Sequence, residues 1–351
     1  MAASCTRIAE RLFFAAGVAM ALTPFAGQAA DGLPGGLHVE FRGTLSLPDE
    51  ASTAGGGRMR LTGASGITWL GGDRFIAVMD NSASIVRLRL ELATDGTPRS
   101  ASDVEPITVA ERHDYEDVAP RLGGVPALFL CEEDTPAIRM FRLDDGAAAG
   151  TIPLPPVARA RRDNRGLESL ALDPDGSHLW TANEEALIPD GGAVGNGAGT
   201  VVRLMRLPLR ADSRPFQAAY RVEPPHDLVT VFAGPTLSGV VALVALGHGR
   251  LLVLERSAGP GLPPFESRLY LVDTSNAADV SGVGSDLAAR PELVAGKTLV
   301  WSGALGLNLE GLCLGPKLHE NRRALVGISD NGGLATPTQV VGFELSAVTS
   351  P

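Results

Sequence analysis

Short apolar runs separated by polar turns dominate the chain after its first 30 residues. Five segments share one pattern: a Ser or Glu, a short apolar run, a turn, and a second apolar run that ends on an acid. The second runs are FIAVMD (75–80), ALFLCE (127–132), LWTANE (179–184), LLVLE (251–255) and LVGISD (325–330). Runs this short, rich in Val, Ile, Leu and Phe, favour strands over helices. Each segment is therefore predicted to form a β-hairpin.

A third apolar run follows each hairpin, and some repeats offer a fourth. The third runs are IVRLRL (85–90), IRMFRL (138–143), VVRLMRL (201–207), RLYLV (268–272) and VVGFEL (340–345). Candidate fourth strands are 106–110, 151–154 and 299–302. The repeats begin 51, 52, 70 and 72 residues apart. Four short strands in each such unit predict an all-β fold, a β-propeller.

The spacing of the repeats bears on the number of blades. Five blades are visible, and the long spacings leave room for a sixth, degenerate blade in 205–235 or 275–302. Six blades are therefore predicted. The strand 38–47 has no hairpin of its own and is predicted to complete the last blade and close the ring. A two-sheet β-sandwich is the competing architecture, because polar and apolar residues alternate poorly.

Residues 1–29 have the layout of a secretory signal peptide. Arg7 and Arg11 precede an apolar run at 12–22, and small residues follow up to a cleavage point near Ala29. The run is too short to cross a bilayer, and an uncleaved anchor is the alternative. We expect one propeller domain, 30–351, exported to the periplasm or secreted, monomeric and without a membrane span.

Composition argues against several classes of protein. The chain carries 30 Lys+Arg against 40 Asp+Glu, a formal net charge of −10, which argues against a nucleic-acid partner. It contains no P-loop, no HExxH, no Cys/His cluster and no GxSxG in a strand–turn–helix context. After export, Cys131 and Cys313 remain, and they either pair or stay as buried free thiols.

The hairpins bring the acids of the repeats together. A hairpin sets the start of its first strand beside the end of its second. The expected facing pairs are Ser65–Asp80, Glu116–Glu132, Glu168–Glu184, Ser238–Glu255 and Glu310–Asp330. Because the first strand of each propeller blade lines the central channel, these pairs should gather at one mouth of it.

Carboxylates crowded at one mouth must be neutralised. Two like charges about 4 Å apart repel by roughly 4 kcal/mol at an effective dielectric near 20. Some of the acids stay protonated, or a hard cation such as Ca²⁺ or nearby arginines offset them. The candidate arginines on the third strands are Arg87, Arg139, Arg203 and Arg268. Acid–arginine pairs that only join blades are the structural alternative to a functional site.

Three stretches resemble a known family: GASGITWL…DRFIAVMDN (64–81), NRGLESLALDPDGSHLWTANEEAL (164–187) and NLEGLCLGP…RRALVGISDNG (308–332). They are similar to the family named for the esterase-like activity of phytase, over about residues 60–345. The resemblance implies a propeller and suggests hydrolysis of phosphoric esters. It places the family's repeated acids on Glu116, Glu168, Glu184, Glu310 and Asp330, and its arginine on Arg165. Ser65 and Ser238 depart from the pattern, since other repeats carry Glu there.

The predicted function is Ca²⁺-assisted hydrolysis of a small-molecule phosphate ester. The predicted metal ligands are Glu116, Asp117, Glu168 and Glu310. The predicted catalytic residues are Glu168, Glu184, Asp330 and Arg165. Glu184 or Asp330 would act as general base, and Arg165 would offset phosphoryl charge unless it pairs with Glu168. The alternatives are a Ca²⁺-dependent lactonase or carboxyl esterase, and a non-catalytic Ca²⁺-stabilised propeller that binds a cell-envelope ligand or protein.

Overall fold

The computed structural model describes residues 36–347, apart from positions 54, 81, 122, 195–198, 212, 228, 231–233 and 333–335. The predicted signal peptide, residues 1–29, lies outside the described residues. Regular structure within the described residues consists of strands and short 3₁₀ turns. No helix in that part of the chain has the length and apolar character needed to cross a membrane.

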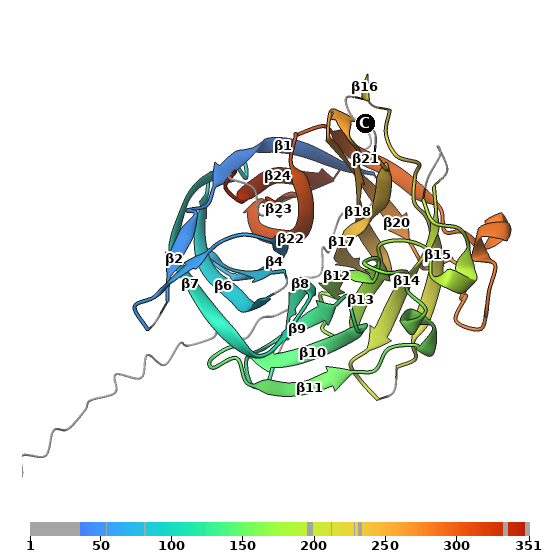
Figure 1. The fold of residues 1–351 in the computed structure, drawn as a ribbon, viewed down its shortest axis with the longest axis horizontal. Helices are drawn as coiled ribbons and strands as arrows, with labels where there is room; N and C mark the ends of the chain where they lie inside the picture. Colours follow the sequence, from blue (N-terminus) through green and yellow to red (C-terminus); the bar gives the residue numbers. More distant parts are fainter. Residues whose placement is uncertain are drawn as a thin grey trace, which may run out of the picture.

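Five four-stranded antiparallel sheets stand in a ring and form the blades of a β-propeller (Figure 1). In blades 1 to 3 the chain runs from the inner strand outward. Blade 1 contains β4 (Ala64–Gly71), β5 (Arg74–Met79), β6 (Ser82–Leu92) and β7 (Pro98–His113). Blade 2 contains β8 (Tyr115–Pro120), β9 (Ala127–Glu132), β10 (Ala137–Arg142) and β11 (Ala148–Ile152). Blade 3 contains β12 (Leu167–Leu172), β13 (His178–Asn183), β14 (Val201–Pro208) and β15 (Phe216–Arg221).

Blades 4 and 5 complete the ring. Blade 4 contains β17 (Leu237–Gly247), β18 (Arg250–Ala258), β20 (Phe265–Asp273) and β21 (Lys297–Gly303). Blade 5 contains β22 (Asn308–His319), β23 (Arg322–Asp330), β24 (Gln339–Ala347) and, outermost, β1 (Leu37–Ser46). Strand β1 pairs antiparallel with β24, so the N-terminal strand closes the last blade as predicted. Figure 1 shows this closure as the blue β1 beside the red β24.

Short two-stranded ribbons and 3₁₀ turns lie outside the blades. Two small ribbons pair β2 (Glu50–Ser52) with β3 (Arg58–Arg60) and β16 (Val229–Thr230) with β19 (Gly261–Leu262). The 3₁₀ turns are Pro156–Arg159, Ile188–Asp190, Leu287–Ala289 and Pro291–Leu293.

The inner strands form a closed circuit of five. Strand β4 lies against β8, β8 against β12, β12 against β17, β17 against β22, and β22 against β4. The prediction of six blades is therefore wrong for the described residues. Residues 205–235 supply the end of β14, the edge strand β15 and the ribbon strand β16, whereas 275–302 supply 3₁₀ turns and most of β21. The long spacings between repeats reflect long connections and not an extra blade.

The hydrophobic core is divided among the interfaces between neighbouring blades. Phe75 of blade 1 packs with Val326 of blade 5, and Trp180 of blade 3 clusters with Leu251 of blade 4. A comparable cluster fills each of the other interfaces. Strands buried on both faces read as nearly continuous apolar runs, which explains the poor alternation in the sequence. The two cysteines of these interfaces, Cys131 and Cys313, are free and buried.

Candidate functional site

A β-bulge interrupts the inner strand of four blades at the repeated polar residue. In blade 3, Leu167 lies opposite Asn183 and Ser169 opposite Ala182, so Glu168 has no partner in the ladder. The equivalent bulged residues of blades 1, 2 and 5 are Ser65, Glu116 and Glu310. A bulge leaves one residue out of the ladder and redirects its side chain. The charges of the three glutamates affect one another's pKa values, so the three side chains lie close together at one end of the channel. We call this end the acidic mouth.

The bulges shift the facing pairs by one residue. Glu132 lies opposite Tyr115 and not Glu116, and Asp330 lies opposite Asn308 and not Glu310. The predicted acid–acid pairs are therefore wrong, because they assumed an unbroken ladder. In each blade, one residue directly follows the second-strand residue that pairs with the first strand just before its bulge. From blade 1 to blade 5 these residues are Asp80, Glu133, Glu184, Arg256 and Asp330. Blade 4 thus contributes an arginine where the other blades contribute a carboxylate.

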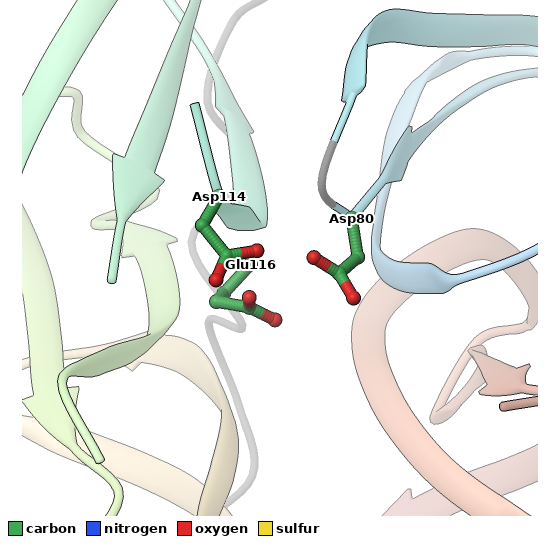
Figure 2. A group of neighbouring side chains, drawn as sticks. All are labelled: Asp80, Asp114 and Glu116. Atoms are coloured by element: carbon green, nitrogen blue, oxygen red, sulfur yellow. The ribbon is translucent and has the colours of Figure 1, made fainter. Parts of the chain in front are cut away.

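Three carboxylates come together at the acidic mouth between blades 1 and 2. One oxygen each of Asp80, Asp114 and Glu116 lies within 4.8 Å of the others, and Figure 2 shows Asp80 facing the other two. Asp114 occupies the single position between β7 and β8, and its side chain and backbone together are 8% exposed. Its Oδ1 is buried and has no hydrogen-bond partner among the described residues. A buried carboxylate oxygen without a donor is unfavourable unless a cation satisfies it, so these three residues, the carboxylate trio, could hold a metal ion.

Burial and like charge raise the pKa values of the mouth carboxyls. Burial, followed by the charges of Asp80 and Asp114, holds the pKa of Glu116 well above its usual range. The pKa of Glu168 is also raised well above its usual range, first by burial and then by Glu116. Burial raises the pKa of Glu310 to about 7, against the opposing charge of Arg256. Without a cation, these carboxyls therefore favour their protonated form more than exposed carboxyls do.

Glu168 and Glu133 form a carboxylic acid–carboxylate pair. Glu168 donates a hydrogen bond to Glu133, which lowers the pKa of Glu133 while burial raises it. The backbone N–H of Gly166 donates to Oε1 of Glu133 at 3.0 Å. Burial raises the pKa of both carboxyls, and that of Glu168 well above its usual range, so Glu168 is the candidate proton donor of the pair.

Two arginines hold Glu184. Nη1 of Arg165 donates to one carboxylate oxygen at 2.8 Å, and Nη2 of Arg256 donates to the other at 2.8 Å. Nη1 of Arg256 also donates to Oδ1 of Asn308 at 3.1 Å and lies 3.6 Å from Oε1 of Glu310. Arg165 therefore pairs with Glu184 and not with Glu168. Glu184, predicted as a candidate base, has both oxygens occupied by guanidinium groups.

Asp117 and Asp330 are also engaged by neighbouring groups. Oδ1 of Asp117 accepts the N–H of Val118 at 2.8 Å, and Oδ2 accepts the N–H of Leu170 at 2.7 Å. Asp117 thus links blade 2 to blade 3 through hydrogen bonds that occupy both of its oxygens. Oδ1 of Asp330 accepts the N–H of Gly332 at 2.8 Å, and Oδ2 lies 3.4 Å from the side-chain nitrogen of Asn308.

Two acids that were expected at the mouth, Glu132 and Glu255, form hydrogen bonds with basic or aromatic side chains of their own surroundings. Glu132 binds Arg139 at 2.8 Å, which is the acid–arginine pair predicted for blade 2. Glu255 accepts hydrogen bonds from Tyr220 at 2.6 Å and Lys297 at 2.7 Å. The other predicted third-strand arginines pair with different acids: Arg87 with Glu105, Arg203 with Asp190, and Arg268 with Glu266.

The inner strands approach so closely at the acidic mouth that two positions require glycine. A Cβ at Gly66 would lie 2.4 Å from Oδ1 of Asp117, and one at Gly239 would lie 2.4 Å from Cγ of Glu184. Blade 4 places its bulge at Val241, and Ser238, which was predicted to face Glu255, lies opposite Ser257. The small residues of blades 1 and 4 therefore make room for acids of their neighbours.

Sequence analysis missed three residues of this mouth, Asp114, Glu133 and Arg256. Asp114 precedes the repeat motif of blade 2 and has no acidic counterpart in the other repeats. Arg256 follows Glu255, which was taken as the last residue of its hairpin. A signal in the sequence could have revealed it: the distance from Ser238 to Glu255 is longer than the corresponding distance in blades 1 to 3.

The family model for phytase-like proteins, described as esterase-like activity of phytase, matches residues 59–333. The chain belongs to this phytase-like family. Its fold is distantly similar to the PQQ-bound aldose sugar dehydrogenase from Streptomyces coelicolor, with 11% identity over 90% of this chain and 100% of that chain and a TM-score of 0.39. A luciferin-regenerating enzyme shows 11% identity over 89% and 96% of the two chains and a TM-score of 0.39. No curated protein sequence matches the chain.

Proposed function

We propose that this phytase-like propeller is a metal-dependent hydrolase of phosphoric esters that uses the acidic mouth as its active site. Membership of a family described by an esterase-like activity supports a hydrolase. The observation that carries the proposal is the carboxylate trio, whose buried Asp114 Oδ1 has no hydrogen-bond partner among the described residues, at the same mouth as Glu168, whose pKa burial raises. A cation site and a proton donor are two parts that can together promote hydrolysis of a phosphoric ester at neutral pH.

The donor set of the trio fits a hard cation. Asp80, Asp114 and Glu116 offer only carboxylate oxygens, which Ca²⁺ prefers as ligands. A bound Ca²⁺ would supply Lewis acidity and lower the pKa of a coordinated water. Of the ligands predicted from the sequence, Glu116 remains in this proposal. Glu168 and Glu310 take other roles.

Each remaining residue has a role that follows from its surroundings. Glu168 gives its proton to the leaving-group oxygen as the P–O ester bond breaks, and Glu133 orients it through their hydrogen bond. Glu310, with a pKa of about 7, accepts a proton from the attacking water at neutral pH. Glu184 positions Arg165 and Arg256 and does not act as the base, since both its oxygens are occupied.

Arg165 is the residue proposed to meet the phosphoryl group. Its hydrogen bonds to Asn164 and Glu184 both start from Nη1, so the guanidinium retains further donors. A planar guanidinium with free donors matches phosphate oxygens. Arg165→Ala should therefore reduce hydrolysis of phosphate esters more than hydrolysis of uncharged esters.

A neutral carboxyl ester or lactone is the second candidate substrate. The same Glu184 holds both arginines, and the remainder of the mouth is acidic, which disfavours an anionic substrate. The trio and Glu168 would serve an uncharged ester equally well. Activity that survives Arg165→Ala would favour this second candidate.

The test combines metal binding with turnover. Protein treated with EDTA is melted with and without Ca²⁺, and the same samples are assayed for phosphate release from phytate and from an aryl phosphate, and for hydrolysis of an aryl carboxyl ester. We expect Ca²⁺ to raise the melting temperature and to be required for phosphate release. Asp114→Asn should abolish the Ca²⁺-dependent shift and lower activity by about 100-fold or more, because even residues behind metal ligands cost that much.

The control for this variant is Asp144→Asn, which changes an exposed aspartate outside the mouth and should behave as the wild type. A Ca²⁺-dependent melting shift without turnover of any ester would instead indicate the non-catalytic propeller that binds a cell-envelope ligand. Normal phosphate release by Asp114→Asn would contradict the proposed site.

A further inference from the structure

The end of the channel opposite the acidic mouth contains a cavity that the proposed function does not use. All five inner strands run from the acidic mouth to this end and line the cavity, whose volume is about 260 Å³. Its wall is largely aliphatic and includes Ile67, Leu170, Val244 and Leu312. We call this the apolar cavity.

An arginine without an acidic partner enters the wall of the apolar cavity. Nη2 of Arg323 donates to the carbonyl oxygen of Gly315 at 3.0 Å, and the guanidinium lies 5.7 Å from the ring centre of Trp69. Its Nε is buried without a hydrogen-bond partner, and no acid among the described residues forms an ion pair with it. Burial lowers the pKa of Arg323. A largely buried charge without a counter-ion is unfavourable, and Arg323 lacks a negative partner among the described residues.

The other charged residues of the wall do not supply that charge. Lys317 adds a second cation. Asp173 is the one acid among the described residues of the lining, and it already accepts the indole N–H of Trp180 at 3.2 Å. It also lies 3.7 Å from Nδ1 of His178, and with a pKa raised by burial to about 6 it supplies one negative charge against the two cations of the wall. The cations of this wall outnumber its acids, so a bound external anion would neutralise the remaining positive charge near Arg323.

We infer that the apolar cavity is a second binding site, for a small organic anion that has an apolar body, such as a medium-chain carboxylate. The aliphatic wall takes the hydrocarbon chain, and Arg323 with Lys317 takes the carboxylate. A volume of 260 Å³ holds about nine water-sized groups, which matches a chain of the length of octanoate. An inorganic anion would leave the aliphatic wall unfilled, and an alcohol would leave Arg323 without a counter-ion.

Calorimetric titration of octanoate into the protein tests this site. EDTA is present, so that binding does not depend on a metal at the acidic mouth. We expect saturable binding of one octanoate and a higher melting temperature, with 1-octanol and acetate each at least tenfold weaker. Octanoate should also change the tryptophan emission of the wild type and leave that of Trp69→Phe unchanged, since Trp69 stacks on the binding arginine.

Variants of two adjacent arginines make the test specific. Arg323→Gln should weaken octanoate binding at least tenfold, and Arg323→Lys, which keeps the charge, should retain most of it. Arg322→Gln is the matched control, because Arg322 is half-exposed and pairs with Glu344. Asp114→Asn should bind octanoate as the wild type does, which separates this site from the proposed active site. Unchanged binding by Arg323→Gln, or 1-octanol or acetate binding as tightly as octanoate, would overturn the inference.

Discussion

The two ends of the channel are built by the same five inner strands, yet they carry opposite chemistry. At the acidic mouth, bulges take Glu116, Glu168 and Glu310 out of the ladder. Beyond the bulges, the strands line the other end mainly with aliphatic side chains. The comparison shows that in blades buried on both faces, local irregularity of the backbone decides where charge can be placed at the axis.

The arginines at the two ends differ in the same way. Arg256 is surrounded by Glu184 and Glu310, whereas Arg323 has a carbonyl oxygen and an indole ring as neighbours. Among the described residues, acids balance the charge of Arg256, and none forms an ion pair with Arg323. Experiments that remove a charge at one end at a time should therefore separate the two ends.

The largest effect is expected from Glu168→Gln at the acidic mouth. Loss of a general acid should lower turnover by about 10²–10⁴-fold, while the neutral amide keeps a donor for Glu133 and preserves the fold. Kinetic assays with the aryl phosphate measure the loss, and octanoate binding at the other end should stay unchanged. Glu320→Gln, an exposed position outside the acidic mouth, is the control. Wild-type turnover by Glu168→Gln would remove Glu168 from the mechanism.

Replacing each arginine by Met should give unequal losses of stability. Arg256→Met leaves Glu310 without its cation and Glu184 with Arg165 alone, and should cost about 4 kcal/mol in the free energy of unfolding. Arg323→Met removes an unbalanced charge and should leave that free energy equal or higher. Urea unfolding measures both, and Glu184→Gln should recover part of the loss in the Arg256→Met background. Equal losses for the two arginines would contradict the contrast between the ends.

The metal-free protein should lose stability as pH rises. The folded pKa of Glu310 is raised from 4.5 to about 7, so the folded state binds this proton more tightly than the unfolded state. The resulting stability is fully present below pH 4.5 and is lost as pH rises through 7, by roughly 3 kcal/mol for Glu310. Unfolding in EDTA across this range measures the loss, and Ca²⁺ should reduce it. A metal-free protein that gains stability over the same range would show that the mouth acids are already ionised.

The smallest effect is expected from Asp117→Asn. The amide can accept the N–H of only one of Val118 and Leu170, so the free energy of unfolding should fall by about 2 kcal/mol. The Ca²⁺-dependent rise in melting temperature should remain, because this side chain joins two blades. Loss of that rise would restore Asp117 to the metal ligands predicted from the sequence.

Much of the ring could be predicted from the sequence, since its strands are short and apolar. The predicted strand 127–132 coincides with β9, and the closing strand 38–47 differs from β1 by one residue at each end. The blade number could not be predicted, because a long connection and a degenerate blade leave the same spacing in a sequence.

The candidate site was predicted only in part. Glu116, Glu168 and Glu310 meet at one mouth as expected, because each occupies the same position near the start of the inner strand of its blade. The bulge that shifts their partners is a property of the backbone and leaves no residue pattern that was recognised. Asp114 was missed because it stands outside the repeat and matters only through its distance from Asp80 and Glu116.

The most direct test of the central claim is calorimetric titration of Ca²⁺ into EDTA-treated protein, compared with Asp114→Asn and Asp117→Asn. The account predicts a saturable Ca²⁺ site in the wild type and in Asp117→Asn, and binding weakened by about 100-fold or more in Asp114→Asn. Wild-type affinity in Asp114→Asn, or no Ca²⁺ binding by the wild type, would contradict a metal site at the carboxylate trio.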